Sequence, residues 1–397
     1  MEVIDQMAKP VTLEDRDSLV DSCTTSLSSK VVSDYSKILA PMAVDCVTKI
    51  IDKETATNVD LRNINVVKKL GGTIDESEII EGLCFVDKKA SHLAGGPTRK
   101  ENAKIALIQF PISAPKSDLE SSVVVPDHVA MDRIIKEERT YILGIVKKII
   151  ASGANVLMLQ KSILREAVSD LALHFLGKKG IVVIKDIDRD EIDFISRTIN
   201  ATPVAHADHL TADKLGHADL VEESNAGGSS KIVKVTGCPG SGTICVLLRG
   251  SNQLILDEAD RSLHDALCVV RALVKKRSFV PGGACVEMEV AHQLVKYARE
   301  LSGSDSYVSR AYGEALELIP YTLAENAGLD PILFVTELRN KHNQGERYAG
   351  LNIKQSTIMN MEETEVIQPT LVSSSALTLA TECVRMILKI DDIVVTR

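Results

Sequence analysis

Apolar residues recur at intervals of three and four between residues 257 and 275, which is the spacing of one face of an amphipathic helix. The apolar face carries Leu263, Leu267, Val270 and Val274, and the opposite face carries Arg261, Asp265, Cys268 and Ala272. Asp265 is therefore predicted to point away from the packing face. A turn with Gly282 and Gly283 follows, and this pairing suggests phosphate chemistry, although the spacing alone favours a solvated carboxylate and an ordinary loop.

The pattern changes between residues 77 and 245. Apolar segments at 104–110, 155–161 and 180–187 are predicted strands, and helical patterns separate them, which indicates an α/β domain. One of these patterns, at 131–150, predicts an amphipathic helix. Its apolar stripe consists of Met131, Ile134, Ile135, Ile142, Ile145 and Ile149.

The flanks of this region are predicted to be mainly helical. Residues 18–51 are interpreted as helices, with Pro41 opening the second, and 61–72 as a strand closed by Gly71 and Gly72. Beyond residue 278 the pattern is again helical, with one turn-rich insert at 340–360.

Composition restricts the class of protein. A chain of 397 residues with 45% hydrophobic content is expected to form two or three domains. A net charge of −9 argues against nucleic-acid binding, and no uninterrupted apolar run approaches the roughly 18 residues of a membrane helix. The amino terminus lacks a signal-peptide pattern, and the eight scattered cysteines are interpreted as reduced thiols, so a soluble cytoplasmic protein is expected.

Two local motifs are not interpreted as sites. His206 and His209, with Asp208 and His217 nearby, have a metal-like spacing but lack further ligands, so no metal site is predicted. The glycine-rich segment 237–242 lies between two strand-like segments and is predicted to be a hairpin turn.

Several segments carry a family resemblance in a consistent order. These are TSLSSKVVSDYS (25–36), NVLMLQKSILREAVSDLALHFL (155–176), RSLHDALCVVRALVKK (261–276), IPYTLAENAGLDPI (319–332) and SSALTLATECVRMILKIDDIVV (374–395). Together they resemble a group II chaperonin subunit of the eukaryotic cytosolic kind. The resemblance implies a multidomain α/β and α chaperonin fold, with a mainly helical equatorial domain, a small intermediate domain and an α/β apical domain with a helical protrusion.

The resemblance also implies nested domain boundaries. Residues 1–17 would be equatorial, 18–76 intermediate, 77–245 apical, 246–277 intermediate and 278–397 equatorial. The helix at 131–150 would form the protrusion, and the alternative is a plain scaffold helix. The family's glycine-rich G-D-G-T-T phosphate loop and L-G-P motif are absent from this sequence, so we expect a fragment that lacks an amino-terminal equatorial segment and hydrolyses ATP poorly by itself.

For the nucleotide site, the resemblance implies ATP and Mg²⁺ as cofactors, with the metal held largely by phosphate oxygens and by an aspartate of the absent segment. Asp265 would orient the water that attacks the γ-phosphate. The nucleotide-binding positions would be Ser28, Ser29, Lys30, Gly282, Gly283, Gly350, Leu351, Asn352 and Gln368. Without the resemblance, Ser28 to Lys30 would be interpreted as a polar helix end. Ala284 replaces the family's usual third glycine, and Gln368 replaces an acid found in many relatives.

For polypeptide binding, a helix is predicted over Leu164 to Leu176. Its apolar face, with Leu164, Ala167, Val168, Leu171 and Phe175, would pack on the apical sheet. Client contacts would use the mixed face with Arg165, Glu166, Ser169, Asp170 and His174.

The implied function is an ATP-dependent chaperone subunit that folds cytosolic polypeptides in a double ring with other chaperonin subunits. The alternatives are a truncated, non-hydrolysing polypeptide-binding module and an unrelated α/β metabolic enzyme.

Overall fold

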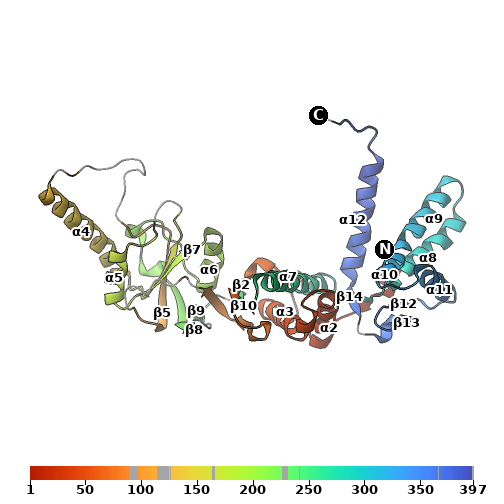
Figure 1. The fold of residues 1–397 in the computed structure, drawn as a ribbon, viewed down its shortest axis with the longest axis horizontal. Coiled ribbons are helices and arrows are strands. Elements are labelled where there is room, and N and C mark those ends of the chain that lie inside the picture. Colours follow the sequence, from red (N-terminus) through yellow and green to blue (C-terminus); the bar gives the residue numbers. More distant parts are fainter. Residues whose placement is uncertain are drawn as a thin grey trace. The chain divides into compact units, whose positions relative to one another are not determined.

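The computed structural model describes residues 1–86, 88, 96–113, 125, 127–162, 166–225, 231–240, 242–364 and 366–395. The chain divides into two compact units, one made of Met1–Val59 and Arg261–Arg397 and the other of Asp60–Asp260 (Figure 1). All eight cysteines lie among the described residues as free thiols, and five of them are buried.

The unit Asp60–Asp260 contains a six-stranded sheet with the strand order β4-β9-β8-β5-β6-β7. Strands β5, β6 and β7 are parallel, and the other neighbours pair antiparallel. The elements of this sheet and its helices are β4 (Gly82–Val86), β5 (Arg99–Ile108), α4 (His128–Ser152), β6 (Val156–Gln160), α5 (Asp170–Lys178), β7 (Val182–Ile187), α6 (Ile192–Ile199), β8 (Gly216–Asn225) and β9 (Lys231–Thr236).

Alternating side chains of the central strands build two separate cores, one on each face of the sheet. Ala106 and Ile108 of β5 pack with apolar residues of α4 and α5, whereas Ile105 and Leu107 pack with α6. Because successive strand residues point to opposite faces, a strand buried on both sides needs an almost continuous apolar run. This is the reason that the three predicted strands are recognisable in the sequence.

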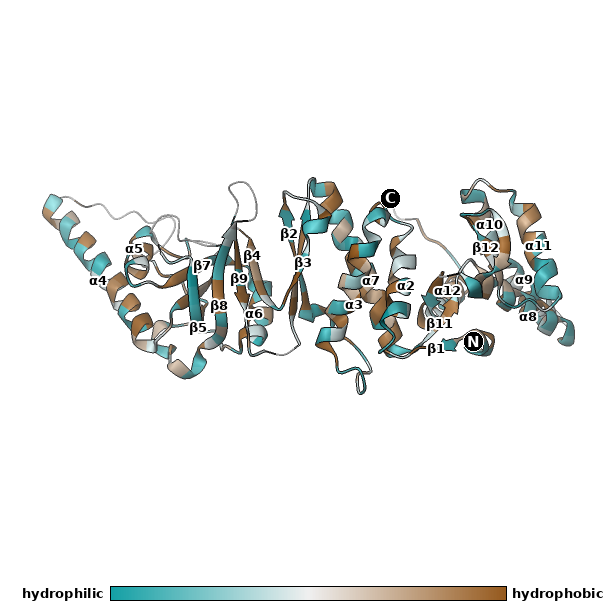
Figure 2. Ribbon diagram, turned by 90° about the horizontal axis from the view of Figure 1, so that it is seen from below, coloured by the Kyte–Doolittle hydropathy of each residue, from teal (hydrophilic) through white to brown (hydrophobic). Residues whose placement is uncertain are grey.

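Helix α4 is buried along only part of its length. Its second half, with Ile142, Ile145 and Ile149, packs on the sheet, whereas Met131 and Ile134 in the first half are exposed. Apolar and polar bands alternate along this outer half (Figure 2). The helix therefore extends beyond the sheet that anchors it.

A smaller sheet in the same unit has the order β2-β10-β3, from β2 (Ile64–Leu70), β3 (Glu78–Ile80) and β10 (Ile244–Gly250). Strand β10 is parallel to β2, and the backbone N–H of Gly71 donates to the carbonyl of Gly250 over 2.8 Å. Strands β9 and β10 thus belong to different sheets. The predicted hairpin at 237–242 is wrong, because this segment carries the chain from one sheet to the next.

The unit of Met1–Val59 and Arg261–Arg397 is mainly helical, and α7 (Gln253–Lys275) leads into it from the other unit. Three short strands form a sheet in the order β1-β11-β14, and β12 and β13 form a hairpin in the predicted turn-rich insert. Its further elements are α1 (Glu2–Met7), β1 (Lys9–Pro10), α2 (Arg16–Leu27), α3 (Ser36–Ile50), β11 (Ser278–Pro281), α8 (Cys285–Glu300), α9 (Ser304–Leu316), α10 (Leu318–Asn326), α11 (Pro331–Asn343), β12 (Ala349–Asn352), β13 (Thr357–Asn360), β14 (Ile367–Pro369) and α12 (Thr370–Leu388).

Two predicted helix starts are wrong. Pro41 does not open a helix but is the sixth residue of α3, where buried Ala40 and Met42 on either side hold it in place. Helix α5 begins at Asp170, after the N-cap Ser169, because Val168 pairs with Ile112 in an isolated bridge and is therefore extended.

Helix α12 bears on the sequence expectation about membrane spans without overturning it. Among the described residues, α12 alone is long and apolar enough by length and composition to cross a bilayer, a test that core helices of soluble proteins also pass. Serines, threonines, Glu382 and Arg385 interrupt the apolar residues of this helix, so the sequence contains no uninterrupted apolar run here. Only 11% of the apolar stretch of α12 is buried inside the structure. Leu379 and Leu388 are among its exposed side chains.

The position of Pro41 generates a stability prediction. A proline inside a helix removes one backbone hydrogen bond and is about 3 kcal/mol less favourable than alanine in a helix interior. Pro41→Ala should therefore raise the free energy of unfolding by about 1–3 kcal/mol, measured by urea denaturation.

The matched control is Pro331→Ala, at the first position of α11 after the N-cap Asp330, where proline is favourable. This control should give no gain in stability. Equal effects of the two substitutions would contradict the explanation.

Candidate nucleotide site

Lys30 and Asp265 form an ion pair between the end of α2 and the exposed face of α7. The α7 face that packs consists of the predicted Leu263, Leu267, Val270 and Val274, all buried. The Asp265 side chain is 53% exposed and that of Lys30 only 19% exposed. The prediction that Asp265 points away from the core is confirmed, and the structure adds its partner.

Lys30 reaches this position because α2 ends just before it. The N–H of Ser28 donates to the carbonyl of Thr24 over 2.9 Å, and the N–H of Lys30 donates to that of Leu27 over 3.1 Å. The hydroxyls of Ser28 and Ser29 donate to backbone carbonyls of the last turn. Of the three predicted residues, only Lys30 contacts a side chain of another element, namely Asp265 of α7.

The turn Gly282–Ala284 leads directly into the amino terminus of α8. Gly283 and Ala284 both have left-handed backbone conformations, with φ of 67° and 58°. Glycine adopts this conformation without cost, whereas alanine carries a penalty of about 1 kcal/mol. The replacement of the family's third glycine by Ala284 thus falls on a position where glycine would be favoured.

Strand β12 lies immediately behind this turn. The N–H of Leu351 donates to the carbonyl of Gly283 over 2.9 Å. A Cβ on Gly283 would lie 2.9 Å from the Leu351 carbonyl oxygen, and one on Gly350 would lie 2.4 Å from Met361. Both glycines are therefore required for internal packing, and Gly283→Val would disturb the fold whether or not a nucleotide approaches the turn.

A cleft of about 600 Å³ opens in front of the same turn, lined by Gly283, Ala284, Glu287, Gln368 and residues of α9 and α10. The N-terminus of α8 carries the positive end of its macrodipole, which favours anions such as phosphate. Burial raises the pKa of Glu287, which also lines this cleft.

The predicted residues thus fall into two groups. Gly283 and Gln368 line the cleft, with Gly282 in the same turn and Gly350 and Leu351 behind it; Lys30 and Asp265 form the separate ion pair. The side-chain amide of Gln368 donates to the hydroxyl of Ser373 over 2.9 Å, and that of Asn352 lies 3.1 Å from the sulfur of Met359. Asn352 is therefore held by the β12–β13 hairpin itself.

Sequence reasoning missed a buried charge pair beside this site. Nδ1 of His342 lies 2.7 Å from Oε2 of Glu289, and its Nε2 lies 3.0 Å from the carbonyl oxygen of Ala349. Since a carbonyl only accepts, Nε2 must donate, and the carboxylate is best matched by a second N–H on Nδ1. Burial by itself raises the pKa of Glu289, but hydrogen bonds from His342 and Gln293 outweigh it and lower that pKa overall.

The predicted polypeptide-binding residues lie around the start of α5. Ser169 is the N-cap, and its hydroxyl accepts from the N–H of Ala172 over 3.4 Å, while Asp170 and His174 lie on the helix. Glu166 precedes it, and Arg165 lies outside the described residues. The buried helix face consists of Ala172, Leu173 and Leu176.

No group of three or more His, Cys, Asp or Glu residues in the described part of the chain could hold a metal ion. In the His206–His209 segment, Asp208 forms an ion pair with Lys148 of α4.

The chain is similar to known chaperonin subunits throughout its length. The TCP-1/cpn60 chaperonin family matches residues 1–397. Proteins named T-complex protein 1 subunit delta from Arabidopsis thaliana, Dictyostelium discoideum and Homo sapiens are 61%, 58% and 57% identical, over 100% of this chain and 74%, 74% and 73% of their own lengths. The solved open-state monomer of a group II chaperonin from Methanococcoides burtonii is 32% identical, with a TM-score of 0.71 over 98% of this chain and 89% of that one.

These findings define the class of protein as a group II chaperonin subunit, and the predicted multidomain α/β and α fold is confirmed. The chain belongs to the TCP-1/cpn60 chaperonin family. Within this family, the relatives named above are delta subunits of T-complex protein 1, and the chain is similar to them over its full length. The function is that of an ATP-dependent chaperone subunit, and the two alternatives are not favoured.

The buried pair generates a prediction about stability and pH. Glu289→Gln should lower the free energy of unfolding by about 3–5 kcal/mol near neutral pH, because it leaves a buried imidazolium without its counter-charge. In the unsubstituted chain this contribution is present above the ordinary glutamate pKa of 4.5 and is lost as the pH falls through the lower folded-state pKa.

Urea denaturation of both proteins across this range measures the effect. The difference between them should shrink below a pH of about 4.5, because protonated glutamate and glutamine are then equivalent. A difference that does not change with pH would contradict this account.

Proposed function

We propose that the Lys30–Asp265 pair and the cleft at the Gly282–Ala284 turn are the two parts of one ATP-hydrolysing site. The observation that carries this proposal is the ion pair, because it joins the only predicted catalytic carboxylate to the only predicted phosphate-sensing cation across 235 residues of sequence. A carboxylate that is 53% exposed and held by a lysine is available to orient water.

The division of chemistry follows from the groups present. The N-terminus of α8 supplies positive potential for phosphate oxygens, and Gly350 and Leu351 support the turn from behind. Lys30 binds either the Asp265 carboxylate or a terminal phosphate, so the arrival of phosphate releases Asp265 to position the attacking water. Mg²⁺, when bound, neutralises the charge on the transferred phosphoryl group, and the glycine-rich loop of the family would hold the phosphates on the other side.

Polypeptide binding is proposed for the unit Asp60–Asp260. Glu166, Ser169, Asp170 and His174 supply polar and charged groups around the start of α5, and charge pattern would then select among clients. Arg165 is proposed as a further client contact from the sequence alone. The exposed apolar half of α4 supports its proposed role as a protrusion over bound clients.

Assembly into a ring with other chaperonin subunits, and folding of unfolded polypeptides in the cytoplasm, complete the proposal. It is supported by the exposed apolar side chains of α12, since large exposed apolar patches mark protein interfaces.

We further propose the five-segment domain boundaries 1–17, 18–76, 77–245, 246–277 and 278–397. The six-stranded sheet, whose strands run from Gly82 to Thr236, would form the core of the apical domain.

The catalytic assignment predicts a selective loss of turnover. Asp265→Ala should reduce phosphate release about 10²–10⁴-fold with ATP affinity nearly unchanged, because Asp265 acts on the transition state. Calorimetry and steady-state phosphate release should be measured on a chaperonin homo-oligomer whose subunits also carry the glycine-rich phosphate loop, so that active neighbours cannot mask the loss.

The control is Asp17→Ala, which removes an exposed carboxylate of α2 and should change neither quantity. Unchanged phosphate release from Asp265→Ala would refute the assignment and leave Asp265 as a surface carboxylate.

The client assignment predicts a change in binding without a change in fold. A Glu166→Gln, Asp170→Asn double variant should weaken binding of a lysine-rich unfolded polypeptide by about 1 kcal/mol, since two exposed charges are removed. Fluorescence anisotropy with labelled polypeptide measures the affinity. Asp193→Asn on α6, which packs on the opposite face of the sheet, is the control and should have no effect.

A further inference from the structure

A second cavity lies among α8, α9 and α11, separate from the cleft at the Gly282–Ala284 turn, and has a volume of about 420 Å³. Helix α8 lines it with His292, Lys296 and Arg299, which are spaced four and three residues apart and therefore share one face. Arg310 of α9 and Arg339 of α11 complete the cationic lining. This size is within the range of small-ligand sites.

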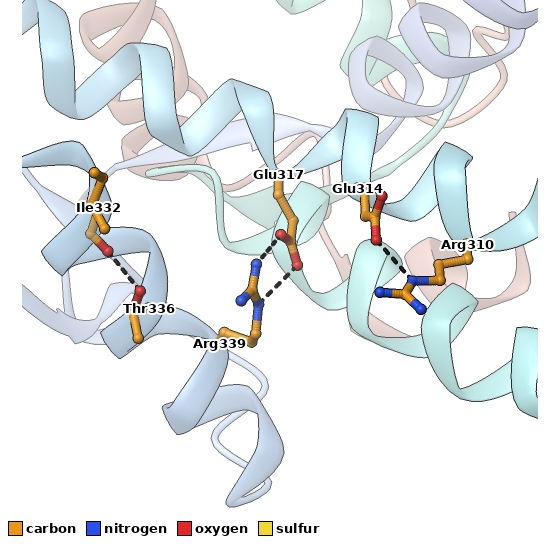
Figure 3. A network of polar contacts seen from close by, with 6 residues as sticks. All are labelled: Arg310, Glu314, Glu317, Ile332, Thr336 and Arg339. Atoms are coloured by element: carbon orange, nitrogen blue, oxygen red, sulfur yellow. Dashed lines mark hydrogen bonds and ion pairs between the residues drawn. The ribbon is translucent and has the colours of Figure 1, made fainter.

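The two acidic side chains of the cavity are already engaged. Nε of Arg310 donates to Glu314 over 2.8 Å, and Arg339 donates to both carboxylate oxygens of Glu317, one of them over 3.2 Å (Figure 3). The Glu317 side chain is only 13% exposed, whereas that of Arg339 is 50% exposed. Each acid thus neutralises one arginine and none is left for the α8 cations.

Lys296 and Arg299 have no hydrogen-bond or ion-pair partner among the described residues. The cavity lining therefore holds two more cations than carboxylates. Adjacent like charges in a recess repel each other and attract an anion more strongly than they would on an open surface.

His292 supplies an independent indication of a ligand. The residue is 7% exposed, lines the cavity, and its Nε2 is buried with no hydrogen-bond partner in the described structure. Burial and then the charge of Lys296 lower the pKa of His292, with smaller contributions from His342 and Arg299, and these effects outweigh the opposing effect of Glu289. A buried polar atom without a partner is costly unless something else satisfies it.

We infer that this cavity is a binding site for a small phosphate-bearing anion, held by Lys296 and Arg299 with His292 at its base. Phosphate matches the donors, because guanidinium groups bind two of its oxygens at once and an ammonium adds a compact full charge. The site is distinct from the proposed ATP site, since none of its lining residues belongs to the cleft.

The cavity is also connected through hydrogen bonds to β12, the strand that carries the proposed nucleotide-binding residues Gly350 and Leu351. His292 belongs to the same helix as Glu289, whose partner His342 bonds the carbonyl of Ala349 at the start of β12. An anion that neutralises Lys296 and Arg299 would raise the pKa of His292 and alter the charge beside this pair.

Pyrophosphate titrated into the full chain by isothermal calorimetry tests the inference. All proteins should carry Lys30→Gln, so that binding at the proposed ATP site is weakened in every arm. A Lys296→Gln, Arg299→Gln double variant should bind pyrophosphate at least about tenfold more weakly, because two charge-assisted contacts are lost. Lys37→Gln, an exposed lysine of α3 outside the cavity, is the matched control and should bind as before.

A second measurement is independent of variant folding. In imidazole-labelled chain, the NMR signal assigned with His292→Gln should titrate at a higher pH when pyrophosphate is present. Equal pyrophosphate affinity in the double variant and the control would overturn the inference, as would an unchanged His292 titration. Tighter binding of citrate than of pyrophosphate would overturn the assignment to phosphate.

Discussion

The close approach of two backbone segments organises the helical unit. A Cβ on Gly283 would lie 2.9 Å from the Leu351 carbonyl oxygen and one on Gly350 would lie 3.0 Å from the Gly283 carbonyl oxygen, and the Leu351 N–H to Gly283 carbonyl bond joins the segments. This contact fixes the amino terminus of α8 against β12. It thereby decides where the cleft lies and which backbone dipole faces it.

Charges in the same unit are arranged in three different ways around that contact. The Lys30–Asp265 pair is half exposed and can exchange partners, the Glu289–His342 pair is buried and structural, and Lys296 and Arg299 have no partner among the described residues. The degree of burial separates these roles, because water screens an exposed pair and leaves a buried one strongly coupled. One unit can therefore hold an ion pair that exchanges partners, an ion pair that stabilises the fold and cations that are available to a ligand.

The pattern of apolar residues predicted strands and helices correctly where burial follows the regular period of a strand or a helix. The strands at 104–110, 155–161 and 180–187 were predicted because both faces of the sheet are covered, and α7 because its stripe packs on one side only. Local pattern failed at Pro41, at the start of α5 and at 237–242. In each case packing or strand pairing with distant residues overrode the local preference for a helix start or a turn.

The sequence by itself determined the family, the α/β and helical regions, the exposed position of Asp265 and the types of residue available for nucleotide chemistry. Only the tertiary structure decided which of those residues meet. Lys30 and Asp265 are 235 residues apart and Glu289 and His342 are 53 apart, and no local period records either pairing. The cavity beside His292 needs three helices at once, so its excess of positive charge exists only after they have packed.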